Sequence, residues 1–175
     1  MRFLALLLAL IFSTGTKLEP PRWYKPTVSY WIGEDTADYA MLNDSSNVES
    51  AIREWKNPYV SLVPAKDSDS ADICIRWIKQ FTYRPNTSGL TKYVFDTVGN
   101  SERIKHVDID LAHLHSTGQI LESWKRHAIA LHEMGHALGL DHIDDTTRIM
   151  SPIVYVDKLD YRDRAQLDSL YQGKH

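Results

Sequence analysis

Apolar and polar residues alternate along four short runs of the chain, at 27–32, 59–63, 71–78 and 104–111. Alternation with a period of two is typical of a strand that buries one face. In the run at 71–78, for example, Ile73, Ile75 and Trp77 alternate with more polar residues. We predict a strand at each run. The proline-rich stretch at 17–25 predicts an extended lead-in, and turn-forming residues at 80–100 predict a loop in which 93–95 pair only briefly.

Three further segments repeat apolar residues at helical spacing, at 35–57, 124–138 and 159–171. In the first, a break at 43–47 indicates that the helix proper begins with Ser45 or Ser46 as its N-cap, and Asn57-Pro58 ends it. A helix between the first two strands implies a right-handed β-α-β crossover, which makes those two strands a parallel pair.

The first sixteen residues have the pattern of a secretory signal peptide. Arg2 precedes an unbroken apolar run at 3–12, and small residues follow at 13–16. Ten apolar residues are too few to cross a bilayer, which takes about 20. We therefore expect a signal peptide at 1–16, one domain at 17–175 and no stable membrane insertion after cleavage. The product would be secreted, or periplasmic in a bacterium, and an uncleaved anchor is the alternative.

Composition narrows the function classes. The 175 residues carry a formal net charge of -3, so the basic stripe expected of a nucleic-acid-binding protein is absent from the sequence. Cys74 is the single cysteine, which excludes an internal disulfide, and its place in a predicted strand favours a small core residue. We expect one compact monomeric domain that is stabilised by packing and by metal.

One eleven-residue stretch, 132–142, carries the chemistry and reads H-E-x-x-H-x-x-G-x-x-H. On a helix, His132 and His136 share one face, so both can bind the same ion. Gly139 can adopt the left-handed conformation that ends a helix, and the chain can then return His142 as third ligand. Three imidazoles leave the fourth position of a zinc ion open, as in catalytic sites. Glu133 would lie beside that ion as general base.

This stretch resembles the metzincin signature, and Met150 strengthens the resemblance. It lies in Arg148-Ile149-Met150-Ser151-Pro152, eight positions after His142, as in the matrixin branch. The resemblance implies an α/β zincin-like fold with a twisted mixed sheet, mostly parallel with one antiparallel edge strand, and two backing helices. It also implies a small C-terminal subdomain with the Met-turn and a final helix. Met150 would pack beneath the zinc, and the sheet edge that binds substrate would lie within 107–115.

The resemblance also suggests roles for residues around the Met-turn. Pro152 and Tyr155 would line a substrate pocket, although Tyr155 stands one place later than the usual tyrosine. Asp163 would hydrogen-bond near the Met-turn, and Asp145 would brace the loop that leads to it. Arg162 replaces an aspartate of the family pattern, which leaves the partner of that position undetermined.

Other polar residues admit more than one interpretation. Histidines 106, 113 and 115 do not reproduce the spacing of the second, structural zinc site of matrixins, so we expect them to be exposed or at the rim of the cleft. His127 is expected to be structural. Structural calcium is a further alternative, with candidate ligands at aspartates 67, 69, 72, 108 and 110, although no calcium-binding loop is legible.

The sequence thus predicts a secreted zinc endopeptidase that acts on proteins or peptides and holds one catalytic zinc ion. Two alternatives stay open. One is a different zinc peptidase fold in which a distant glutamate is the third ligand. The other is a secreted zinc-containing binding protein without catalysis, which would tolerate the loss of Glu133.

Overall fold

The computed structural model describes residues 19–34, 38, 39, 42, 44–84 and 86–172. The predicted signal peptide at 1–16 lies outside these residues. Six strands and three helices form in the described chain, in the order β1 Glu19–Arg22, β2 Thr27–Ile32, α1 Asp44–Glu54, β3 Ser61–Pro64, β4 Ile73–Ile78, β5 Gly89–Val98, β6 Ser101–Ala112, α2 Ser123–Ala137 and α3 Tyr161–Tyr171. No helix among the described residues is long and apolar enough to cross a membrane.

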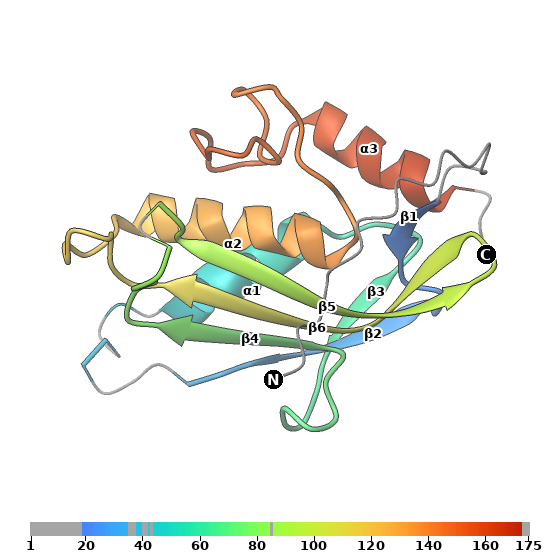
Figure 1. Cartoon of the computed structure of the whole chain (residues 1–175), viewed down its shortest axis with the longest axis horizontal. Coiled ribbons are helices and arrows are strands. Elements are labelled where there is room, and N and C mark those ends of the chain that lie inside the picture. Colours follow the sequence, from blue (N-terminus) through green and yellow to red (C-terminus); the bar gives the residue numbers. More distant parts are fainter. Residues whose placement is uncertain (1–18, 35–37, 40–41, 43, 85, 173–175) are drawn as a thin grey trace, which may run out of the picture.

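The strands form one mixed sheet in the order β1-β6-β4-β2-β3 (Figure 1). The pairs along this path are parallel. β5 pairs antiparallel with β6. The predicted parallel pair on either side of the first helix is confirmed, because β2 and β3 run parallel with α1 between them in the chain.

Two parts of the sheet differ from the prediction. The stretch read as a loop at 80–100 contains the ten-residue strand β5, and the proline-rich lead-in contains the short strand β1. The substrate-binding edge was predicted within 107–115, but this is wrong because β6 lies between β4 and β5. β5 therefore separates β6 from the cleft.

Helices α1 and α2 pack together on one face of the sheet, and α3 lies beyond the far side of α2 (Figure 1). Trp55 joins the first two helices by donating its ring N–H to the carbonyl of Leu131, at 2.7 Å. The Tyr171 hydroxyl of α3 donates to the carbonyl of Leu138 at 2.9 Å. The Trp23 ring N–H donates to the neighbouring carbonyl of Ala137 at 2.8 Å. These bonds satisfy carbonyls near the end of α2 and fix that end in place.

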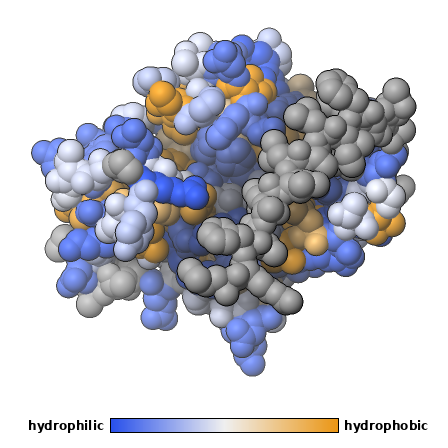
Figure 2. Space-filling view, viewed as in Figure 1, coloured by the Kyte–Doolittle hydropathy of each residue, from blue (hydrophilic) through white to orange (hydrophobic). Residues whose placement is uncertain are grey.

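The helix starts depart slightly from the prediction. α1 begins at Asp44 rather than after Ser45 or Ser46. Asp44 is fully buried, and its carboxylate accepts from Arg126 of α2 at 2.5 Å. α3 begins two residues later than predicted, because Asp160 forms a capping box with Asp163. In the space-filling view, the described surface of this face of the molecule is largely hydrophilic, with separate hydrophobic patches (Figure 2).

Candidate active site

Helix α2 carries two of the three predicted histidine ligands, and Gly139 ends the helix. His132 and His136 lie one turn apart near its C-terminus. Gly139 has φ +93°, and a Cβ at this position would collide with the carbonyl oxygen of Pro21. Only glycine fits both the left-handed backbone and the close approach of the neighbouring chain. The predicted helix end is confirmed, and the chain turns back toward the helix at His142.

The Nε2 atoms of the three histidines converge on one point. The Nε2 atom of His142 lies 3.2 Å from that of His132 and 3.1 Å from that of His136. Three nitrogens at the usual zinc distance in a tetrahedral arrangement would be about 3.3–3.4 Å apart. The spacing therefore fits a single ion of zinc's size, and the histidine cluster is one that could hold a metal.

The other ring nitrogens fix which side of each ring can bind a metal. The Nδ1 of His132 lies 2.7 Å from the carbonyl oxygen of Ile149, and the Nδ1 of His136 lies 2.8 Å from that of Leu140. A ring nitrogen that faces a carbonyl must carry the proton, so each Nε2 keeps a free lone pair. Burial lowers the pKa of His132 to about 4, with a smaller contribution from His136. The ring is therefore neutral at physiological pH, as a metal ligand requires.

Glu133 is 6% exposed and extends toward β5. Its Oε2 accepts a hydrogen bond from the Thr91 hydroxyl at 2.6 Å. Burial raises the pKa of Glu133 to about 7, and the bond from Thr91 acts in the opposite direction. A Cβ at Gly89 would collide with the Glu133 carboxyl group, so glycine leaves the space that this side chain occupies. A carboxyl group in this range can exchange protons at neutral pH.

Gly89 and Thr91 were missed by the sequence reasoning because 80–100 was read as a loop. A signal for β5 was nevertheless present. The run 91–98 is rich in β-branched and aromatic residues, and Gly99-Asn100 separates it from the next strand. Two such runs joined by a Gly-Asn pair are typical of a β-hairpin. Gly99 indeed has φ +63°, and Val98 pairs with Ser101 across the turn.

A cavity of about 1220 Å³ contains the three histidines and Glu133. Its walls come from β5, α2, the segment at 152–154 and α3. Pro152 lines the cavity, and its role in a substrate pocket stays a prediction. Tyr155 is 60% exposed and is not among the lining residues, whereas Val154 is. The structure therefore assigns this part of the wall to Val154 rather than Tyr155.

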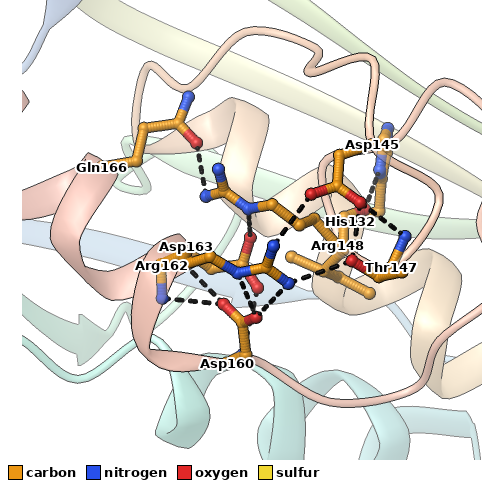
Figure 3. Close-up of polar contacts among 9 residues, drawn as sticks. His132, Asp145, Thr147, Arg148, Asp160, Arg162, Asp163 and Gln166 are labelled. Atoms are coloured by element: carbon orange, nitrogen blue, oxygen red, sulfur yellow. Dashed lines mark hydrogen bonds and ion pairs between the residues drawn. The ribbon is translucent and has the colours of Figure 1, made fainter.

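The segment at 148–150, whose Ile149 carbonyl faces His132, is held by an ion pair to α3. The Nε of buried Arg148 donates to Asp163 at 3.0 Å, and its Nη2 donates to Gln166 at 3.0 Å (Figure 3). Met150, two residues after Arg148, is fully buried. Its sulfur packs so closely against Gly135 of α2 that a Cβ at Gly135 would collide with it. The chain from Arg148 to Met150 is thus fixed between two helices.

Arg162, whose partner was undetermined, proves to be the centre of a second group of contacts (Figure 3). Its guanidinium donates to Asp145 at 3.0 Å, to the Thr147 hydroxyl at 3.0 Å and to Asp160 at 2.7 Å. Asp145 also accepts from the backbone N–H of Thr147 at 2.9 Å, so it braces this loop as expected. The arginine therefore links the loop after His142 to the start of α3.

The remaining candidate residues have mixed outcomes. His113 is buried and bonded to Asp44 at 2.9 Å, so the prediction of an exposed or rim position is wrong for it. Its ring stacks on the rings of Tyr39 and Trp77. His127 bonds to Glu54 of α1 at 2.9 Å, in a structural role as expected. Three of the proposed calcium ligands pair with cationic side chains, as Lys25–Asp72, Arg76–Asp108 and Lys92–Asp110.

Comparison with known proteins adds the family. A family model described as Matrixin matches residues 22–172. Karilysin of Tannerella forsythia is 26% identical over 150 residues, which cover 77% of this chain and 29% of that protein. Matrix metalloproteinase-20 of Homo sapiens is 27% identical over 148 residues, 75% of this chain and 27% of that protein. Interstitial collagenase of Oryctolagus cuniculus is 25% identical over 137 residues, 75% of this chain and 28% of that protein. The chain thus spans less than a third of each relative.

Proposed function

The chain belongs to the matrixin family, and on that premise we propose that it is a zinc-dependent endopeptidase. The observation that carries the proposal is the convergence of three Nε2 atoms beside a buried carboxyl group in one cavity. A zinc site that serves only structure has four protein ligands, whereas three histidines leave one position open. The open position and the neighbouring carboxyl group together favour catalysis over a purely structural metal.

The zinc ion would be bound by His132, His136 and His142. The Nδ1–H groups of His132 and His136 donate to backbone carbonyl oxygens, which leaves their Nε2 atoms free to bind the ion. A bound zinc ion polarises a carbonyl and acidifies a water molecule. In our proposal, the Glu133 carboxylate accepts a proton from the attacking water and then donates it to the leaving amine. Thr91 keeps the carboxylate turned toward β5 and the cavity. Met150 would support the ligands from beneath, as its packing against Gly135 suggests.

The substrate would bind along β5 as an extended chain. β5 pairs with β6, and its residues 89–91 and 93 also line the cavity. A strand with one unpaired edge offers backbone N–H and C=O groups to a peptide without regard to its sequence. Side-chain preference would then come from the pocket wall at 152–154. Proteins and peptides are therefore the proposed substrates.

We further propose that the protein is exported, because residues 1–16 have the signal-peptide pattern. The mature domain would act outside the cell, or in the periplasm of a bacterium, as a monomer. Structural calcium stays a prediction.

The test is cleavage of casein by the purified chain with zinc, with chelator, and after Glu133→Gln. The variant keeps the size of the side chain but cannot accept the proton, so we expect at least about a 100-fold loss of activity, with zinc still bound. Glu49→Gln on the exposed surface of α1 is the matched control and should keep full activity.

Two outcomes would count against the proposal. If Glu133→Gln cleaved casein at the rate of the unmodified chain, the general base would be misassigned. If the unmodified chain bound one zinc per molecule but cleaved neither casein nor a peptide library, the non-catalytic binding protein would be favoured instead.

A further inference from the structure

The cavity that contains the three histidines is lined by both cationic and acidic side chains. Among its described lining residues, the cations are Arg84 and Lys125, and the carboxylates are Glu133 and Asp141. Glu133 lies at the centre, next in the chain to the first histidine, whereas Asp141 lies beyond the C-terminal end of α2. The positions of the two cations therefore decide whether the other end of the cavity is positively charged.

Lys125 lies on the face of α2 that borders the cavity. Ile129 and Glu133 follow it at intervals of four residues, so the three side chains share one face of the helix, and all three line the cavity. The backbone of Lys125 precedes that of His132 by seven residues, which corresponds to about 10 Å along the helix. The half-buried lysine side chain therefore borders the cavity near the N-terminal end of α2, beyond an apolar stretch at Ile129.

Arg84 lies at the same end, because β5 runs alongside α2 in the same direction. Thr91 bonds to Glu133. Two residues further along β5, the Tyr93 hydroxyl donates to the carbonyl of His136 at 2.9 Å. The loop that leads into β5 consequently lies beside the N-terminal end of α2 (Figure 1). Arg84 belongs to this loop and lines the cavity from the side opposite the helix.

The two cations have no acidic partner in the described chain. No described carboxylate forms an ion pair with Arg84 or Lys125. The charge of Lys125 acts on Glu122, but the Oε2 of Glu122 lies 3.7 Å from the Nε2 of His115, and Glu122 is not among the lining residues. The Lys125 ammonium lies 5.6 Å from the centre of the Trp124 ring, a contact that leaves its charge uncompensated. This end of the cavity is thus complementary to an anionic group.

We propose that Arg84 and Lys125 select peptide substrates that carry an acidic side chain on one side of the bond to be cut. The inference rests on the proposed peptidase function and specifies its substrate class. An extended peptide advances about 3.3 Å per residue, so the distance of about 10 Å between His132 and Lys125 places the acidic residue three to four positions from the cut. Asp141 at the opposite end repels acidic side chains, which makes the preference one-sided.

The test begins with a library of peptides of about ten residues, digested by the unmodified chain with zinc. Mass spectrometry gives the cut sites. We expect aspartate and glutamate to be enriched at the third or fourth position from the cut, on one side only. Cleavage without this enrichment would overturn the inference and leave the peptidase function standing. A library that stays uncut would refute the peptidase function, and the inference with it.

Matched peptides then measure the charge preference. One carries glutamate at the enriched position and the other carries glutamine, which has nearly the same shape without the charge. One exposed ion pair strengthens binding by up to about fivefold, so two cations predict a ratio of kcat/KM of about 5 to 25 between the two peptides. The ratio should fall toward one at about 1 M sodium chloride, where charges are screened beyond about 3 Å.

Substitution of the two cations tests whether they cause the preference. The double variant Arg84→Glu and Lys125→Glu should favour the glutamine peptide, because this end of the cavity then repels acidic side chains. The double variant Lys66→Glu and Lys79→Glu is the matched control, since it reverses two exposed charges outside the cavity lining and should keep the ratio. A ratio near one for the unmodified chain at low salt would overturn the inference, as would an unchanged ratio after reversal of Arg84 and Lys125.

Discussion

Replacement of Thr91 by valine tests what sets the pKa of Glu133, the proposed general base. Valine has nearly the shape of threonine but lacks the hydroxyl that donates to Oε2 of Glu133 at 2.6 Å. That hydrogen bond favours the charged carboxylate, so its loss favours the protonated form and raises the pKa of Glu133. Glu133 must be ionised to accept a proton from water. The acidic limb of the pH profile of kcat/KM should therefore move to higher pH.

The size of the effect follows from the contact. A hydrogen bond to a charged group contributes about 1.5–3 kcal/mol, and each pKa unit corresponds to about 1.4 kcal/mol, so we expect a rise of about 1–2 units. The acidic limb of Thr91→Val should therefore lie about 1–2 pH units above that of the unmodified chain, and its activity should recover at higher pH. Bound zinc lowers the pKa of Glu133 in both proteins, so the measured quantity is the distance between the two acidic limbs.

The assay is hydrolysis of one peptide by both proteins from pH 5 to pH 10 at saturating zinc. Thr91→Ser is the control, because it keeps the donor and should retain the profile of the unmodified chain. Coincident acidic limbs for Thr91→Val and the unmodified chain would refute the reasoning. An equal loss of kcat/KM at every pH would show that Thr91 positions the carboxylate without affecting its pKa.

Three further predictions concern stability. Gly135→Ala should destabilise the fold by about 1–3 kcal/mol in urea unfolding, because the added methyl collides with Met150 and comes within 2.9 Å of Trp55; unchanged stability would show that the core relaxes freely. Asp163→Asn leaves the buried Arg148 cation without its carboxylate and should lower the free energy of unfolding by about 3–5 kcal/mol in urea. A loss of less than about 1 kcal/mol would count against a structural role for this pair. Removal of zinc by a chelator should lower the melting temperature. If free zinc was a thousandfold above its Kd, the loss corresponds to about 4 kcal/mol. Adding zinc back should restore the melting temperature, and an unchanged melting temperature after chelation would count against a bound ion.

Local sequence was sufficient for the elements whose signals are short-range. The strand at 27–32 has the predicted bounds, and the helix at 123–137 differs from the prediction by one residue at each end. The sequence did not predict β5, although its hairpin turn was visible, because the turn-forming pairs Pro85-Asn86 and Ser88-Gly89 just before it favour a loop. The buried hydrogen bond between His113 and Asp44 could not be predicted, because the two residues are 69 positions apart.

The sequence by itself determined which side chains could together bind a metal ion. Spacing along one helix and a glycine that ends it decide which three imidazoles can meet, and these are local properties of the backbone. Only the tertiary structure decided which strand borders the cavity and that Thr91 bonds to Glu133. It also decided that Arg162 and Arg148 link the segment at 145–148 to the start of α3. These contacts join residues from separate elements, and the pairing of strands and the packing of helices that bring them together depend on the whole core at once.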